Sequence, residues 1–263
     1  DDNGKVWYTG SHVPPDPEFD GQSEIWMQEL DLKQMQLVGE KYYLTRGFSG
    51  GTWAEGPHIY KYGNYYYLMI AEGGTLHNHA VTISVSKTIT GPYIANARNP
   101  ILTHRHLSLN HPIIAVGHGD LVQTKENAWY MVALGFRPID KKYKNLGRET
   151  FLIPVVWETE PYWWKDEKVS WPVCSPKTGK VESEYSVPFP GTKQVNINNF
   201  YDGFDHPELN VEWNFRRTPT SSFHSLNEKI GSLRLYLKKG FISEQGQYSF
   251  VGIRQRHFQM EAK

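Results

Sequence analysis

The 263-residue sequence has little cysteine, no excess of charge of either sign and no long apolar run. Its single cysteine, Cys174, excludes a disulfide within the chain and a cysteine-rich zinc site, which leaves this side chain a packing role or none. The 28 basic and 28 acidic residues give a formal net charge of zero, so we expect no nucleic acid and no membrane surface to be held by charge. No apolar run approaches the roughly 20 residues that span a bilayer. The sequence distinguishes neither a cytoplasmic from a secreted location nor the oligomeric state.

Aromatic residues are abundant instead, with 9 Trp, 16 Tyr and 12 Phe. Aromatic faces stack on the apolar faces of sugar rings, so this composition suits a carbohydrate site. β-Sheets also favour aromatic side chains, and composition by itself does not separate the two explanations.

Helical periodicity is nearly absent, and strand signals dominate. Short segments rich in Tyr, Trp, Val and Ile, bounded by Gly, Asn or Pro, predict strands at 5–11, 65–71, 81–86 and 128–136. Residues 25–40 predict a hairpin with a turn near Lys33 and Gln34. The fold class is therefore expected to be all-β.

One pattern recurs along the first half of the chain. A polar turn precedes an aromatic-rich strand at Trp7, Tyr66 and Trp129, with a spacing of roughly 60 residues. Units of this size built from short strands are typical of the blades of a β-propeller.

The composition changes after Val169. Residues 171–193 are rich in proline and predict a linker or a wrapping segment. Alternating strands then continue to Lys263, as at the start of a β-sandwich, although a complete sandwich needs about 100 residues. We expect a first domain over 1–190 and the beginning of a second over 191–263.

Glu55 is the leading candidate for chemistry. It follows Trp53 and lies between Gly51 and Gly56-Pro57, which fix a tight backbone. An apolar wall formed by Trp53 would raise the pKa of the carboxyl, as a general acid requires near neutral pH. The alternative is a surface glutamate in a turn.

The segment WAEGPHIYK around Glu55 resembles the segment that carries the catalytic acid in family 43 glycoside hydrolases of the β-xylosidase/α-L-arabinofuranosidase type. Further segments resemble this family in the same order along the chain, and they are AEGGTLHNHAVTISVSKTITGPY, RNPILTHRHL, GHGDLVQT, LGRETFLIPVVWE, FDHPELNVEWNFRRTP and SFVGIRQRHF. The last two resemble the β-sandwich that follows the propeller in the β-xylosidase branch.

The resemblance implies a five-bladed β-propeller, here incomplete and without its first blade, followed by the start of a concanavalin-like β-sandwich. It implies an exo-acting hydrolase that releases xylose, arabinose or both from the non-reducing ends of xylan-derived oligosaccharides. It also implies inversion, which needs an acid and a base about 6.5–9.5 Å apart. Two other functions stay open, a non-catalytic carbohydrate-binding propeller fragment and an endo-arabinanase, and the sandwich-like segment argues against the second.

Glu55 matches the family's general acid, whereas the general base and the aspartate that tunes the acid's pKa have no match. We expect both to lie upstream of Asp1, so residues 1–263 by themselves should not hydrolyse glycosides. Asp16, in the proline-rich segment 14–17, looks like the motif around the family's base. We interpret it as part of a loop between two strands of one blade.

The remaining matches lie on the substrate side of the family's site. Arg148 matches an arginine that reaches sugar hydroxyls, although an ion pair with Glu149 or Glu158 is an alternative. His118 matches the central histidine near the propeller axis, where it could orient the site, bind a hydrated metal ion such as Ca²⁺, or simply pack in the core. Thr75 and His79 match residues beside the acid, and Trp53 is expected to wall the pocket. The resemblance implies no required cofactor.

Overall fold

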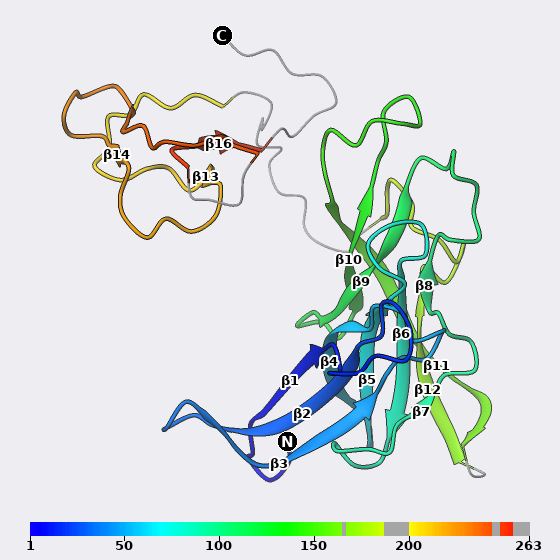
Figure 1. The fold of residues 1–263 in the computed structure, drawn as a ribbon. Helices are drawn as coiled ribbons and strands as arrows, with labels where there is room; N and C mark the ends of the chain where they lie inside the picture. Colours follow the sequence, from blue (N-terminus) through cyan, green and yellow to red (C-terminus); the bar gives the residue numbers. More distant parts are fainter. Residues whose placement is uncertain (165–166, 187–199, 244–247, 255–263) are drawn as a thin grey trace. The chain divides into compact units, whose positions relative to one another are not determined.

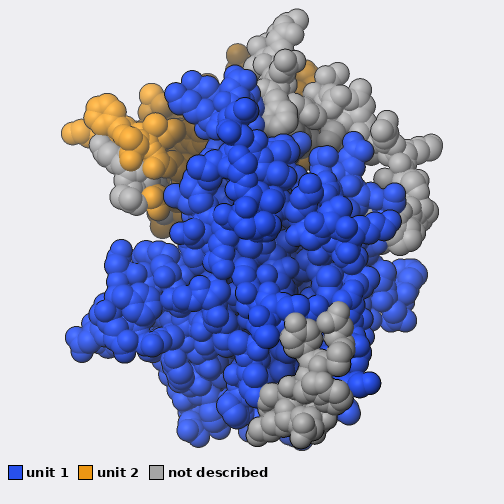
Figure 2. Space-filling model, turned by 90° about the vertical axis from the view of Figure 1, so that its right-hand side faces the viewer, with its two compact units in different colours: residues 1–187 blue, residues 188–263 orange. Residues whose placement is uncertain are grey.

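A computed structural model describes residues 1–164, 167–186, 200–243 and 248–254, with the side chains of 160–167 left out. The chain divides into two compact units, residues 1–187 and 188–263 (Figure 2). Every regular element of the described residues is a β-strand (Figure 1), which confirms the all-β prediction. No helix in this part of the chain is long and apolar enough to cross a membrane.

The first sheet contains β1 (Trp7–His12), β2 (Glu24–Asp31) and β3 (Gln36–Thr45) in that order, all antiparallel. The predicted hairpin is confirmed, because Asp31 Oδ1 accepts hydrogen bonds from the amides of Lys33 (2.8 Å) and Gln34 (3.1 Å) in the turn. Asp16 lies exposed in the loop between β1 and β2.

The second sheet contains β4 (Glu55–Tyr62), β5 (Tyr65–Glu72), β6 (Ala80–Ser86) and the short β7 (Ile94–Ala95), with β8 (Leu102–Thr103) also paired to β6. A two-residue turn joins β4 to β5, and Gly63 adopts a φ of 57° there, as hairpins of this length require. Almost every side chain of β5 and β6 is buried, so this sheet forms the centre of the unit.

The third sheet contains β9 (Ile114–Gln123), β10 (Trp129–Phe136), β11 (Glu149–Trp164) and β12 (Glu167–Cys174), in the spatial order β12-β11-β10-β9. Residues 171–174, predicted as part of a linker, lie in β12 instead. Trp171 and Cys174 are buried in the core, and Pro172 is tolerated because β12 is an edge strand of its sheet. Burial raises the pKa of the Cys174 thiol to about 12, which is consistent with a packing role.

The second sheet contacts both of the others. Its β4 contacts β1 and β2, and its β5 and β6 contact β9 (Figure 1). The hydroxyl of Tyr67 in β5 donates to the carbonyl of Ser170 in β12 at 2.5 Å. One apolar cluster spans the second and third sheets and includes Val81, Met131 and Ile153.

Residues 175–186 wrap back over this core. Of the two alternatives predicted for this segment, a linker or a wrapping segment, the structure shows the second. Val181 is buried, and its amide donates to Nε2 of the buried His104 at 2.9 Å. The rest of the predicted segment, from residue 187 to 193, lies outside the described residues.

The described residues of the first unit form three sheets, and the count of five blades stays a prediction. In the second unit, β13 (Trp213–Phe215) pairs with β16 (Val251–Ile253), and β14 (His224–Ser225) pairs with β15 (Arg234–Leu235). Within 231–240 only β15 is a strand, which is shorter than the alternating apolar and polar residues of this segment predict. The predicted strand residues 195–199 and 255–263 lie outside the described part of the chain.

Candidate functional site

Glu55 is the first residue of β4 and lies opposite Ala71 of β5. The β4–β5 register is irregular between Glu55 and His58, so Glu55 stands beside the regular ladder rather than within it. Its side chain is 42% exposed, and Oε1 lies 3.5 Å from Nδ1 of His118. The carboxyl is thus open to a ligand on one side and faces an imidazole on the other.

His118 lies in β9, and its ring packs against Gly56, the residue that follows Glu55. A Cβ on Gly56 would lie 2.5 Å from His118 Nε2, so a larger residue at this position would displace the ring. His118 itself has a φ of 51°, which is unfavourable for most residues with a side chain, and such conformations cluster at functional sites. Its Nδ1 is buried without a hydrogen-bond partner in the described structure. The 3.5 Å separation from Glu55 is typical of a ligand-free site, where catalytic contacts are often long.

His79 is buried next to His118. It is 1% exposed, and its ring centre lies 6.4 Å from that of His118. Nδ1 lies 3.0 Å from the carbonyl oxygen of Ala115, which can only accept, so Nδ1 carries the proton. Burial lowers the pKa of His79, and the charges of His118 and Arg148 act in the same direction. The Ala115 carbonyl and Glu55 oppose this shift, but His79 is neutral near pH 7.

Arg148 lies exposed just before β11, and its charge reaches His79. The structure therefore brings Glu55, His79 and His118 into one neighbourhood, and Arg148 lies close enough for its charge to act on His79. They come from four segments that are far apart in the sequence.

Trp53 and Thr75 lie on two loops that pack together. Trp53 is 46% exposed, and a Cβ on Gly74 would lie 3.2 Å from its Cδ1. Thr75 is exposed beside Gly74. The wall that Trp53 is expected to form beside Glu55 stays a prediction.

Two supporting residues were not singled out from the sequence. The Tyr60 hydroxyl donates to Asp120 and accepts from the amide of Leu121 at 2.8 Å, which ties β4 to β9. Glu72 ends β5 with a buried carboxylate. A signal for it was present, since a charge directly after the apolar run of β5 and before two glycines is unusual.

The donors around His118 do not fit a protein-bound metal ion. Within the residues that the structure describes, no group of three His, Cys, Asp or Glu side chains could hold one. Nδ1 of His118 faces Glu55, and its ring lies against Gly56.

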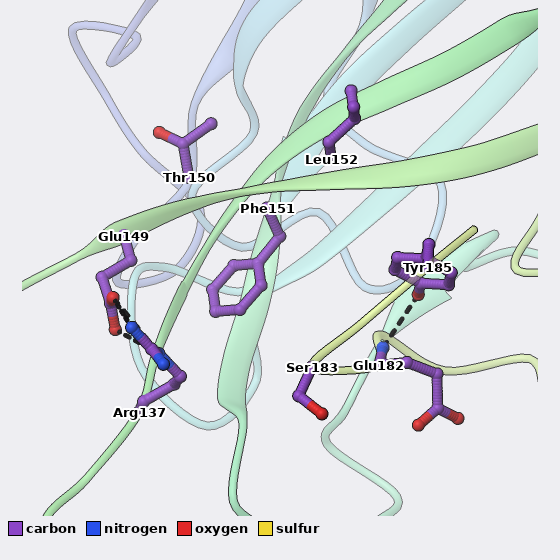
Figure 3. A pocket seen from close by; sticks show the side chains of 8 residues that line it. All are labelled: Arg137, Glu149, Thr150, Phe151, Leu152, Glu182, Ser183 and Tyr185. Atoms are coloured by element: carbon purple, nitrogen blue, oxygen red, sulfur yellow. Dashed lines mark hydrogen bonds and ion pairs between the residues drawn. The ribbon is translucent and has the colours of Figure 1, made fainter. Parts of the chain in front are cut away.

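A polar pocket of about 350 Å³ lies beside β10 and β11 (Figure 3). Its lining consists of Arg137, Glu149, Thr150, Phe151, Leu152, Glu182, Ser183 and Tyr185. Arg137 donates to both carboxylate oxygens of Glu149, and the Tyr185 hydroxyl accepts from the amide of Glu182 at 2.8 Å. These polar groups already bind one another, and the pocket contains neither Glu55 nor its histidine neighbours.

Two family models match the chain. Residues 1–161 match Glycosyl hydrolases family 43, and residues 201–263 match the Beta xylosidase C-terminal Concanavalin A-like domain. A xylosidase/arabinosidase of Butyrivibrio fibrisolvens is 38% identical over 97% of this chain and 48% of its own length. A non-reducing end alpha-L-arabinofuranosidase of Bacteroides ovatus is also 38% identical, over 98% of this chain and 48% of its own length.

Solved structures agree with these matches. The xylan beta-1,4-xylosidase of Bacillus halodurans superposes with a TM-score of 0.81 at 32% identity, covering 98% of this chain and 47% of that one. The chain thus spans about half the length of the relatives it matches. With a family model that covers most of the first unit and relatives that match nearly every residue, the chain belongs to glycosyl hydrolase family 43.

Proposed function

We propose that this chain carries the general acid of an exo-acting glycoside hydrolase. The enzyme would release xylose, arabinose or both from the non-reducing ends of xylan-derived oligosaccharides, with inversion. The observation that carries the proposal is the Glu55 carboxyl, which is partly open at the start of β4 and faces the unpartnered Nδ1 of His118. The named activities of the relatives support the substrate class.

In the proposed reaction, protonated Glu55 donates its proton to the glycosidic oxygen as the bond to the sugar breaks. His118 orients the carboxyl, and the neutral His79 holds His118 in place. Arg148 donates to hydroxyls of the terminal sugar, while Trp53 and Thr75 border the pocket. Inversion also requires a base about 6.5–9.5 Å from the acid, and the resemblance assigned that role to no carboxylate of this chain.

We also propose the domain organisation that this function requires. Residues 1–190 belong to the five-bladed catalytic propeller, and residues 191–263 begin the β-sandwich. The match of residues 201–263 to a β-xylosidase C-terminal domain supports this reading over an endo-arabinanase.

The test compares Glu55→Ala with wild type on two substrates, both in a full-length protein that contains this chain together with the expected upstream base. General acid catalysis contributes about 10²–10⁴-fold, so hydrolysis of xylobiose should fall by this factor. Hydrolysis of a dinitrophenyl xyloside should fall far less, because a good leaving group needs little protonation. Glu40→Ala, which removes an exposed carboxylate of β3, is the matched control and should behave as wild type.

Equal losses on both substrates would contradict the role of Glu55 as acid. Binding of xylo-oligosaccharides without turnover by the full-length wild type would favour the alternative, a non-catalytic carbohydrate-binding propeller. Calorimetric titration with xylobiose separates that outcome from a protein that does not recognise the sugar.

A further inference from the structure

Glu72 is a charged residue at a buried position beside the proposed acid. It is the last residue of β5, and its exposed fraction is 1%. In the β4–β5 ladder its neighbour Ala71 pairs with Glu55, so Glu72 lies one residue from the position opposite the acid. A buried carboxylate is costly unless hydrogen bonds satisfy it, so its partners reveal what it holds.

Those partners lie on the loop that leads to Glu55. Glu72 Oε1 accepts from the amide of Phe48 at 2.6 Å, and Oε2 accepts from the amide of Ser49 at 2.9 Å and from its hydroxyl at 3.3 Å. The amide of Gly51 lies 3.4 Å from Oε2. The Thr82 hydroxyl of β6 also donates to Oε1, at 2.6 Å. The carboxylate thus accepts the hydrogen bonds from the amides of the loop 48–51 that a neighbouring strand would otherwise accept.

The backbone of this loop is folded tightly around the carboxylate. Gly47 has a φ of 123°, which residues with a side chain rarely adopt. A Cβ at Gly47 would lie 2.6 Å from the Cα of Gly51 and 3.0 Å from Glu72 Oε2. There is consequently no room for the loop to move closer, and outward movement would break the hydrogen bonds to Glu72.

The same end of β5 also holds the residues that follow the loop. The amide of Gly73 donates to the carbonyl of Thr52 at 2.8 Å. The next residue, Trp53, has a φ of 54°, and its amide donates to the carbonyl of Gly21 at 2.6 Å. The strained Trp53 is therefore fixed from both sides, and Glu55 follows two residues later.

We propose that Glu72 is a positioning residue for the reaction. Its carboxylate holds the loop 48–51, and through it Trp53 and the acid Glu55, in the geometry that catalysis uses. This inference rests on the proposed function of Glu55, although the hold on the loop is testable without it. Glu72 acts through Glu55 and does not itself touch the reacting atoms.

The first experiment measures amide hydrogen exchange in Glu72→Gln and in the matched control Thr82→Val. Glutamine keeps the volume but turns one acceptor oxygen into a donor that faces the loop amides. Exchange at Phe48, Ser49 and Trp53 should accelerate about tenfold or more, as expected for lost charge-assisted hydrogen bonds. Thr82→Val removes a donor to Glu72 that comes from β6 and leaves every acceptor of the loop amides in place, so these rates should change less than in Glu72→Gln. Unchanged exchange at Trp53 in Glu72→Gln would overturn the proposal, whatever the activity.

The second experiment uses the full-length protein with the expected upstream base and measures how kcat depends on the leaving group across a series of aryl xylosides. A misplaced acid makes the rate more sensitive to leaving-group quality, whereas a purely structural loss lowers the amount of active protein equally for all substrates. Glu72→Gln should therefore lose at least about tenfold more on a phenyl than on a dinitrophenyl xyloside. Accelerated exchange with an unchanged leaving-group dependence would overturn the positioning role.

The two proposals fail in different ways. If a full-length wild type that also carries the expected upstream base hydrolyses none of the xylosides, the proposed function and the catalytic purpose of Glu72 are both wrong. The exchange rates at Trp53 then still decide whether the carboxylate holds the loop.

Discussion

Replacing Gly117 with alanine tests how tightly His79 is packed beside His118. Gly117 lies in β9, and its φ is outside the left-handed region, so alanine can adopt this backbone without strain. An added Cβ would nevertheless lie 2.5 Å from Cγ and Cδ2 of His79 and 2.8 Å from the amide nitrogen of Ala80. Carbon atoms do not approach so closely, so the ring or the strand has to shift.

The ring has little freedom to do so, because His79 is buried and its Nδ1 is bound to the carbonyl of Ala115. Overpacking of this kind costs about 1–3 kcal/mol. The loss of glycine's freedom in the unfolded chain offsets about 0.4–1 kcal/mol. The free energy of unfolding should therefore fall by roughly 1–2 kcal/mol, and each kcal/mol lowers Tm by about 2–4 °C in a domain of this size.

Gly119→Ala is the matched control in the same strand. Its Cβ would meet the Sδ of Met131 at 2.6 Å, but a methionine side chain is flexible and can reorient. Urea or thermal unfolding of the two variants and wild type measures the difference. If Gly117→Ala is as stable as Gly119→Ala, the tight packing of the His79 ring against Gly117 is refuted.

Three further predictions follow from single residues. Arg148→Ala should cost about 2–4 kcal/mol of transition-state stabilisation in kcat/KM, and Arg148→Lys should recover little because the planar fork is lost; near wild-type kinetics would place Arg148 outside the site. Tyr60→Phe should lower the free energy of unfolding by about 1–3 kcal/mol, because the buried amide of Leu121 loses its acceptor, whereas Tyr143→Phe at an exposed position should change it little. Burial lowers the pKa of His104 below the value near 6.5 that it has in the unfolded chain, so around pH 6.5 and below the unfolded chain binds more protons than the folded one. The stability that neutral His104 contributes is therefore fully present above pH 6.5 and is lost as the pH falls below it. Unfolding free energies at pH 5 and 7 should show this loss, and a His104→Gln variant with the same pH dependence would contradict it.

Much of the strand framework followed from local pattern. β1, β5, β6 and β10 begin and end within about two residues of the predicted segments, because alternating or continuous apolar residues between turn formers leave few other structures. Residues 171–174 were the exception. Their prolines and short length indicated a linker, but the apolar Trp171 and Cys174 gain more from burial at the sheet edge than local propensity costs.

The candidate acid was found through the sequence, while its surroundings depend on the fold. Glu55 is distinctive in its local setting, since Trp, Gly and Pro surround it. The approach of His118 to Glu55, and the requirement for glycine at 56 and 117, arise between strands distant in the chain. No local pattern encodes such distances.

By itself the sequence determined an all-β chain, several strand segments of its first unit and a candidate acid, Glu55, between Trp, Gly and Pro. Those features depend on side-chain alternation and backbone freedom, which act over a few residues. Only the tertiary structure decided that His79 is a buried neutral support for His118, and that the carboxylate of Glu72 holds the loop before Glu55. The physical reason is that burial and hydrogen bonding are shared properties of several segments, so they exist only once the sheets have packed against one another.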